Sequence, residues 1–247
     1  MRLIDLRSDQ CDFFGPHAPV AVLPIGAVEQ HSRHLPLGTD MLIAEAVAME
    51  VERRLPRDVL LLPTIAVGAS DHHLTMPGTL SIGTRAIADT IGRQAVSLHR
   101  SSGVRSFLIL NGHGGNQPAA RLAIEDVRSA EPHLNVYATD YWAPMFEVLD
   151  QRRIPRPEGM GHADIVETSI LLEHRPDLVA VDRMQPDAYR DGLPPHVHSS
   201  AGIPERTRHG GVGDPSEASA ERGRDLLDAA ASGVVSLIEW IAGRPTA

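Results

Sequence analysis

The segment SFLILNGHGGNQ, residues 106–117, carries the clearest structural signal in this chain. Its first five residues form an apolar run of the length of a buried strand, and three glycines surround His113 in the loop that follows. Helical spacing begins at Gln117 and continues to about residue 130. A strand that passes into a helix through a short glycine-rich loop is typical of a βα unit in a parallel sheet.

The same alternation of strands and helices extends to both sides of this segment. Apolar runs predict further strands at residues 18–25, 59–67 and 134–138, and helical spacing predicts helices at 40–55, 84–100, 163–174 and 214–240. Repeated βαβ units predict the α/β fold class with a largely parallel central sheet, and such sheets bind ligands beyond the carboxyl ends of their strands. Residues 151–160 and 176–213 are expected to form loops, the second with room for a hairpin.

Two helix starts are predicted from capping residues. Thr84 has the side chain of an N-cap. Asp214 is followed by Pro215 at the first helical position and Glu217 at the third, which predicts the start of the last helix. No repeat or linker divides the chain, so a single domain spanning residues 1–247 is expected.

Composition and charge exclude several classes of function. The chain has 247 residues, of which 42% are hydrophobic, and a net charge of −9, so neither nucleic acid nor an anionic membrane is an expected partner. No apolar run reaches the roughly 18 residues of a membrane span, and the N-terminus lacks a signal-peptide core, which favours a cytoplasmic protein. Cys11 is the only cysteine and lysine is absent, which excludes an internal disulfide, a cysteine zinc site and a Schiff-base lysine.

Acidic and imidazole side chains follow the first predicted strand. Glu29 and His31 are two residues apart, so in extended backbone both project to one side. Asp40 follows at the start of a predicted helix, and His113 lies at the end of another strand. Because carboxylates and imidazoles bind zinc and similar ions, these residues predict a pair of divalent cations at the carboxyl edge of the sheet.

Each of these residues also has a simpler interpretation. Asp40 has the position of an ordinary carboxylate at a helix N-terminus, and Glu29 and His31 suit a polar surface loop. The loop around His113 resembles a phosphate cradle, but its glycine spacing does not fit a dinucleotide-binding loop and no lysine is available. We therefore favour metal binding by His113.

A further group of polar residues opens the helix predicted at 163–174. Asp164 and Glu167 are three residues apart on one helical face, and the apolar neighbours of Glu167 favour a partly buried acid over a solvated one. His162 joins them only if it precedes the helix. His72 and His73 are adjacent in sequence, so at most one of them is expected to face a given site.

Four ordered motifs resemble the creatininase (creatinine amidohydrolase) family. They are EQHxxHLPLxTD at 29–40, PGT at 77–79, NGHGGN at 111–116 and HAxxxETS at 162–169. The resemblance covers roughly residues 18–175. It implies a three-layer α/β/α fold, a binuclear zinc or manganese centre with Fe²⁺ as an alternative, hydrolysis of an amide bond, and a homo-oligomer that is often a hexamer.

The resemblance also implies a set of metal ligands. Asp40 bridges the two ions, one of which is also held by Glu29 and His113. The other is held by His31 and a further carboxylate, for which Glu167 is the candidate.

This chain departs from the family pattern at several positions. In creatininase itself the further carboxylate lies two residues after the ligand histidine, where this chain has Gly115. Glu167 is therefore expected to act in metal binding and catalysis, and His162 is the candidate proton shuttle, because histidine titrates in the useful range. The family usually has Gly-Pro at 32–33 and Gly at 164, so the resemblance alone does not identify the substrate. The candidate substrate contacts are Arg33, Ser70, His73, Tyr141 and Trp142.

Three functions are compatible with these patterns. The first is a metal-dependent amidohydrolase that acts on a small cyclic amide or formamide. The second is a peptidase of the same family that trims a peptide during maturation of a redox cofactor. For a peptide, the loops at 176–213 must form an open groove, whereas for a small ring they must form a closed lid. The third is a non-catalytic metal or ligand-binding protein, which would not need His162 and Glu167.

Overall fold

The central sheet consists of four parallel strands. The computed structural model describes residues 1–11, 18–157, 159–194, 197 and 199–243, so parts of the loops predicted at 151–160 and 176–213 lie outside the described residues. The strand order is β2-β1-β3-β4, and the strands are β1 Val20–Ile25, β2 Val59–Leu61, β3 Ser106–Asn111 and β4 Asn135–Asp140. Ile25 pairs with Asn111, and Asn111 pairs with Asp140, so these strands end at one edge. The predicted α/β class is confirmed.

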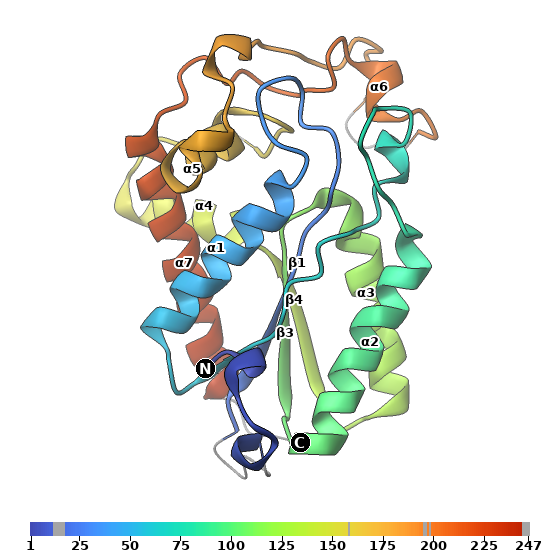
Figure 1. Ribbon diagram of the computed structural model, residues 1–247, viewed down its shortest axis with the longest axis vertical. Helices are drawn as coiled ribbons and strands as arrows, with labels where there is room; N and C mark the ends of the chain where they lie inside the picture. The colour runs from blue at the N-terminus through green and yellow to red at the C-terminus, as the bar shows by residue number, and fades with distance from the viewer. Residues whose placement is uncertain (12–17, 158, 195–196, 198, 244–247) are drawn as a thin grey trace.

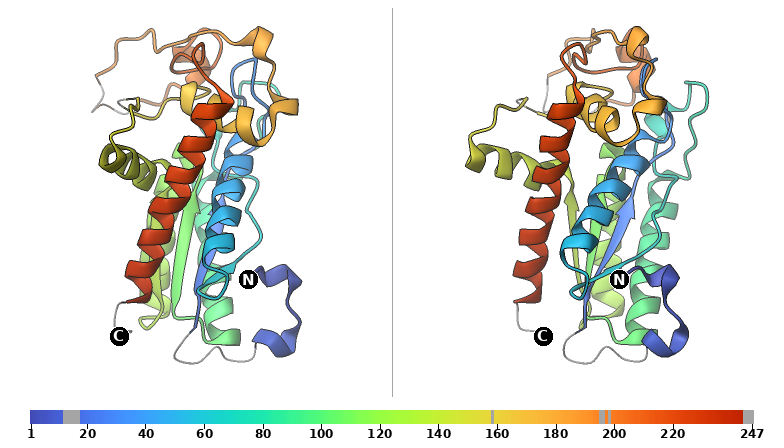
Figure 2. Two further views of the ribbon diagram at one scale, coloured as in Figure 1. Left: turned by 90° about the vertical axis from the view of Figure 1, so that its left-hand side faces the viewer. Right: turned by 60° about the vertical axis from the view of Figure 1, so that its left-hand side comes forward.

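Helices cover both faces of this sheet (Figures 1 and 2). One face carries α1 Thr39–Arg54, α4 Trp142–Arg152, α5 Ile165–His174 and α7 Ala220–Ala242, and the other carries α2 Gly83–Ser102 and α3 Gln117–Ala130. Successive strand residues point to opposite faces. Val22 and Leu108 therefore pack with the first group of helices, whereas Leu23 and Ile109 pack with the second. This arrangement confirms the predicted three layers.

Several single-turn helices complete the described part of the chain. They are η1 Leu3–Asp5, η2 Ser8–Cys11, η4 Asp71–His73, η5 Gly114–Asn116, η6 Pro176–Leu178, η7 Val181–Arg183 and α6 Ile203–Arg206. None of the helices in the described residues is both long enough and apolar enough to cross a bilayer.

Two predicted element boundaries are wrong, each for a local reason. The strand predicted at 59–67 ends at Leu61, since Pro63 has no N–H for the sheet. The last helix begins at Ala220, because Ser219 accepts a hydrogen bond from the backbone of Arg222, whereas Asp214 caps only a preceding turn.

Three further local features differ from the sequence-based expectations. Helix α2 begins at Gly83 with no side-chain cap, so Thr84 is not its N-cap. Helix α4, between β4 and the loop at 151–160, was not predicted. The expected hairpin within 176–213 is replaced by isolated bridges, including Asp187 opposite Gly213.

The first turn of α1 lies directly on the ends of β1 and β3. A Cβ atom on Gly26 would lie 2.4 Å from the Cα of Met41, and one on Gly112 would lie 2.5 Å from the carbonyl oxygen of Asp40. Only glycine permits such an approach of backbone to backbone. This contact brings Asp40 to the carboxyl edge of the sheet.

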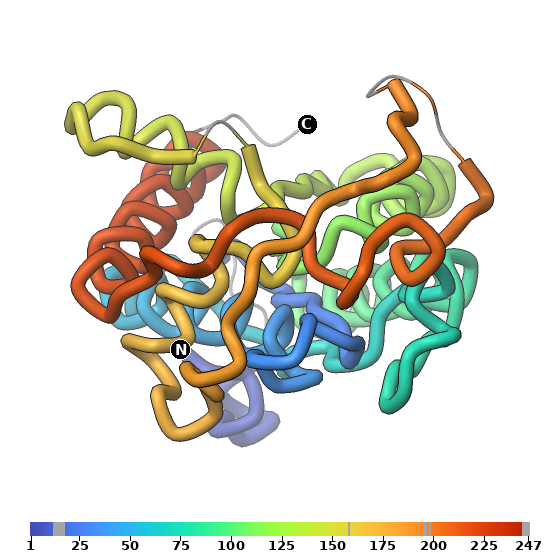
Figure 3. The backbone as a smooth tube through the Cα atoms, turned by 90° about the horizontal axis from the view of Figure 1, so that it is seen from above, coloured from blue at the N-terminus to red at the C-terminus, as the bar shows by residue number. Residues whose placement is uncertain are grey.

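The described residues of 176–213 run across that edge, as Figure 3 shows from above. His162 and Val212 exchange two backbone hydrogen bonds of 2.9 and 2.7 Å, and Gln30 donates its side-chain amide to the carbonyl of Gly210 at 2.9 Å. The segment 207–213 is therefore fastened to the loops that follow β1 and precede α5.

Candidate metal centre

The sheet edge gathers the five residues predicted to bind metal. Glu29 and His31 follow β1, Asp40 is in the first turn of α1, His113 follows β3 and Glu167 is in the first turn of α5. Their side chains are at most 5% exposed. Ligand-type atoms of His31, Asp40 and Glu167 all lie within 4.8 Å of one another. Segments that are far apart in sequence therefore meet in one buried cluster.

Asp40 lies between two imidazoles and offers one carboxylate oxygen to each. Its Oδ1 is 3.0 Å from Nε2 of His31, and its Oδ2 is 3.1 Å from Nδ1 of His113. The other ring nitrogen of each histidine is close to a backbone carbonyl: Nδ1 of His31 to Glu29 at 3.1 Å, and Nε2 of His113 to Ala69 at 3.2 Å. A carbonyl only accepts, so these outer nitrogens carry protons, and the inward nitrogen of each ring faces Asp40, where it can bind a proton or a cation.

Glu29 has no hydrogen bond to either carboxylate oxygen among the described residues. Nevertheless, Nε2 of His73 and Nε2 of His113 are each 3.3 Å from one of its oxygens, and Nδ1 of His162 is 3.7 Å away. A fully buried carboxylate without a donor is costly unless a cation compensates it. Oδ2 of Asp40 likewise lacks a hydrogen-bond partner in the described part of the chain.

Asp164 holds the start of α5, and thereby the position of Glu167. It accepts hydrogen bonds from the backbone of Val166 and Glu167 and, through its other oxygen, from Gly161. Glu167 turns back to accept from the backbone of Ala163 at 2.6 Å. The expectation that Asp164 shares a helical face with Glu167 is wrong, because Asp164 is the N-cap of the helix.

Burial and mutual repulsion give the cluster an unusual set of pKa values. Burial raises the pKa of Glu29 to about 7 and that of Glu167 to about 8. Burial alone would lower the pKa of His31, but the carboxylate of Asp40 outweighs it and raises that pKa to about 10. For His113, the attraction of Glu29 outweighs burial in the same way and raises the pKa to about 9. Without cations, therefore, the cluster holds protons in their place.

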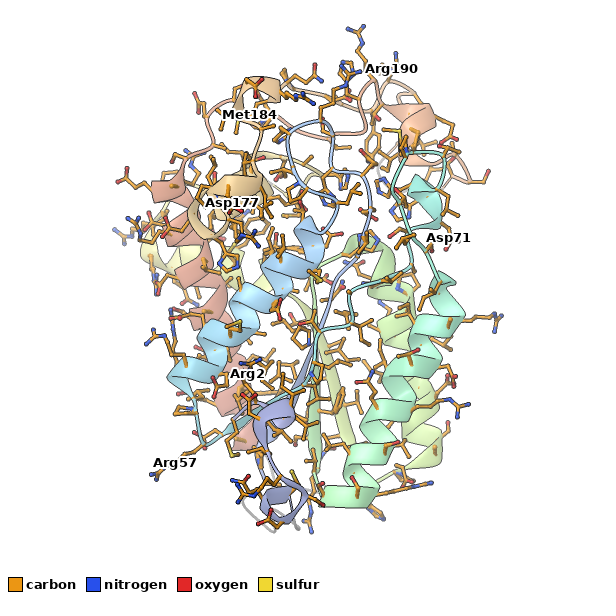
Figure 4. The ribbon with its side chains drawn as sticks, viewed as in Figure 1. Arg2, Arg57, Asp71, Asp177, Met184 and Arg190 are labelled. Carbon is orange, nitrogen blue, oxygen red and sulfur yellow. The ribbon has the colours of Figure 1, made fainter. Side chains whose placement is uncertain are left out.

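His72 and His73 both lie at this cluster, so the expectation that only one would face it is wrong. The ring of His72 stacks on that of His113 with centroids 5.4 Å apart, while His73 faces Glu29. Both belong to the tight turn η4, in which adjacent side chains fan out instead of alternating. Asp71, the first residue of that turn, points to the outside of the molecule in Figure 4.

The other residues predicted to contact the substrate differ in how deeply their side chains are buried. Ser70 is fully buried, with its Oγ 3.5 Å from Nε2 of His113. Tyr141 is also fully buried, in the core between the sheet and α5, and Trp142 packs edge-on against it. Arg33 is exposed and lines a cavity of about 300 Å³ together with Asp182, Arg183, Met184 and Gln185. Met184, one of the residues that line this cavity, lies above α5 in Figure 4.

Sequence reasoning missed Gln30, although this residue lies inside the first motif. Its amide nitrogen is 2.8 Å from Nδ1 of His73 and 3.1 Å from Nε2 of His162. The signal available was its position between two predicted ligands. A neutral amide, however, acquires a role only through partners that lie far away in sequence.

The fold and this cluster define an α/β protein with a buried carboxylate–imidazole centre at its sheet edge. The creatininase family model, described as creatinine amidohydrolase, matches residues 9–238. The chain therefore belongs to the creatininase family, as its four motifs predicted.

Individual relatives agree with this assignment. The mycofactocin precursor peptide peptidase of Mycolicibacterium smegmatis is 33% identical over 232 residues, which cover 90% of this chain and 85% of the relative. The creatinine amidohydrolase of Pseudomonas putida is 28% identical over 236 residues, which cover 89% of this chain and 88% of the relative. A solved structure described as "Creatininase Mn" superposes with a TM-score of 0.82 at 26% identity, covering 98% of this chain and 99% of that chain.

Proposed function

We propose that this enzyme of the creatininase family hydrolyses an amide C–N bond with two divalent cations, zinc or manganese, shared by Asp40. The observation that carries the proposal is the placement of Asp40 between the inward ring nitrogens of His31 and His113. Each ring is held by a backbone carbonyl on its far side, which is the usual support of a metal-binding histidine.

The donor set fits such ions. His31, Asp40 and Glu167 would hold one cation, and Asp40, His113 and Glu29 would hold the other. Two divalent charges would compensate the three buried carboxylates, which have no arginine or lysine partner among the described residues. Bound there, such ions supply an activated water at neutral pH and polarise the carbonyl that it attacks.

His162 is placed to move the proton that the leaving nitrogen needs. Its side chain is 13% exposed, more than that of any predicted ligand, so it lies at the boundary between the cluster and the covering segment. Its Nε2 donates to the backbone carbonyl of Gln30 at 2.8 Å, which leaves Nδ1 free to accept a proton on the side of Glu29. Burial, together with the nearby His31, keeps the pKa of His162 well below its usual value, so the ring is neutral in the metal-free cluster.

A peptide is the substrate that the relatives favour. The relative from Mycolicibacterium smegmatis is described as a peptide peptidase and matches at higher identity than the creatinine amidohydrolase does. Arg33 and Arg183 give this small cavity two cationic side chains against the single carboxylate of Asp182. A guanidinium pairs well with a carboxylate, so we assign this cavity to an acidic side chain or to the terminal carboxylate of the peptide.

A small cyclic amide is the second candidate, and the covering segment favours it. Residues 207–213 are hydrogen-bonded over Gln30 and His162, and the predicted ligands beneath are buried. An enclosed site of this kind suits a compact substrate better than an extended one.

Both substrates are tested in one experiment. Chelator-treated protein, reloaded with zinc or with manganese, is incubated with creatinine and with a library of short peptides, and the products are identified by mass spectrometry. We expect reloaded protein to cleave and chelated protein to be inactive. His162→Asn should keep its metal and lose turnover. Full activity of metal-free protein would overturn the proposal. If creatine is the only product, the substrate is the small cyclic amide and not a peptide.

A further inference from the structure

The imidazoles around the centre differ in which ring nitrogen carries the proton. Three of them tie one nitrogen to a backbone carbonyl, which only accepts, so that nitrogen is protonated and the inward nitrogen is left for a cation or a further proton. They are His31 with the carbonyl of Glu29 at 3.1 Å, His113 with that of Ala69 at 3.2 Å, and His162 with that of Gln30 at 2.8 Å.

His73 has the opposite arrangement, and the side chain of Gln30 imposes it. The backbone N–H of Ser32 donates to Oε1 of Gln30 at 3.0 Å, and Nε2 of Gln30 donates to the carbonyl of Gly210 at 2.9 Å. These two backbone contacts fix which end of the amide is oxygen and which is nitrogen. The second amide hydrogen is then directed to Nδ1 of His73, 2.8 Å away. Nδ1 of His73 accepts, so its proton is on Nε2.

The N–H of His73 is turned toward the centre and is not engaged there. Nε2 lies 3.3 Å from Oε1 of Glu29, yet that oxygen has no hydrogen-bond partner among the described residues. His73 is 2% exposed, so the donor is also shielded from solvent. Among His31, His73, His113 and His162, His73 is the ring whose nitrogen toward the centre must carry the proton, because its other nitrogen accepts from Gln30 and no backbone carbonyl takes up its N–H.

Gln30 has little freedom to change this arrangement. A Cβ atom on Gly210 would lie within 2.1 Å of Oε1 of Gln30, so the glycine backbone rests directly on the amide. The backbone N–H of Gln30 also donates to Oγ1 of Thr79 at 3.1 Å. The orientation of the amide is thus set jointly by the loop after β1 and by the covering segment.

We propose that Gln30 is a positioning residue that holds His73 as a hydrogen-bond donor to the substrate carbonyl oxygen as that oxygen gains negative charge. This inference rests on the proposed amide hydrolysis. A preorganised donor in a water-poor site favours the charged oxygen over the neutral carbonyl and so accelerates the reaction. No proton is transferred by His73, and His162 remains the group that serves the leaving nitrogen.

The tautomer of His73 is measured directly by ¹⁵N NMR of histidine-labelled, zinc-loaded protein. We expect wild-type His73 to carry its proton on Nε2. In Gln30→Glu the carboxylate only accepts, so the proton should move to Nδ1 of His73. His73→Gln identifies the resonances, and the exposed Gln151→Glu is the matched control for the added charge. A proton on Nδ1 in the wild type, or an unchanged tautomer in Gln30→Glu, would overturn the proposal.

Acetate binding tests the donor itself, because acetate resembles the carboxylate product. Removing a charge-assisted hydrogen bond should weaken acetate binding to the zinc-loaded protein by about tenfold to a hundredfold in Gln30→Glu and in His73→Phe, but not in Gln151→Glu. Equal Kd values in all proteins would refute the role of His73. Neither measurement requires turnover, so a protein with the expected tautomer that hydrolyses no amide would overturn the proposed function alone.

Discussion

Replacement of Asp40 by asparagine should weaken the binding of both proposed cations at once. Oδ1 of Asp40 lies 3.0 Å from Nε2 of His31, and Oδ2 lies 3.1 Å from Nδ1 of His113. Glu167 lies on the His31 side, with its Oε2 3.9 Å from the same Nε2. Asparagine keeps the shape but removes the charge from both sides. If each charge-assisted contact is worth about 1.5–3 kcal/mol, the zinc affinity of each site should fall by about tenfold to a hundredfold.

The assay is zinc titration against a chelating dye, with metal content checked by elemental analysis. Asp40→Asn should weaken both of two binding steps, whereas Glu167→Gln should weaken only one, since Glu167 lies on the His31 side. Asp58→Asn is the control, because that aspartate is exposed at the turn before β2. If Asp40→Asn keeps either step at wild-type affinity, the carboxylate is not shared and the central assignment fails.

Three further outcomes are expected. Folding raises the pKa of Glu29 to about 7 and of His31 to about 10, so the metal-free protein should lose stability as pH rises through these values. Zinc should therefore raise Tm more at about pH 9 than at about pH 6. An equal rise in Tm with zinc at both pH values would contradict this. Arg33→Met should raise KM about tenfold for peptides with a free carboxylate and leave kcat unchanged, while Arg57→Met, at the far end of the molecule in Figure 4, should change neither. Gly112→Ala should lower the free energy of unfolding in urea by about 1–3 kcal/mol and reduce kcat about a hundredfold, because the new Cβ meets the backbone of Asp40. In Gly114→Ala the new Cβ meets no atom within 4 Å, so stability and kcat should hardly change.

The sheet and the placement of four of the five predicted ligands at its edge were predictable because they follow from local patterns. Apolar runs mark β1 and β3, and in a parallel sheet the residues that follow such strands meet at one edge. Glu29 and His113 could therefore be placed together without knowledge of any contact. The missed helix α4 is short and carries Pro144 in its first turn, which obscures its periodicity.

The predictions that failed concern positions where the local sequence gives equivalent signals for two outcomes. Asp214 and Ser219 both have the side chain of an N-cap, and only the packing of α7 against α4 and α5 selects the second. The two histidines of η4 reach the same cluster because that turn is tight rather than extended. The side chain of Gln30 contacts three residues, which are separated from it in sequence by 43, 132 and 180 positions. Nothing in the sequence next to Gln30 therefore reveals its partners.

Glu167 differs from the other predicted ligands because it belongs to α5, which packs against α7 at the end of the chain. A cation that joins Glu167 to His31 would fasten the C-terminal helices to the loop after the first strand, closing a long loop that is entropically costly to close in the unfolded chain. Fraying of α5 would then require release of the ion. Backbone amides of that helix should exchange with deuterium only as fast as the whole protein unfolds when zinc is bound, and much sooner once it is removed.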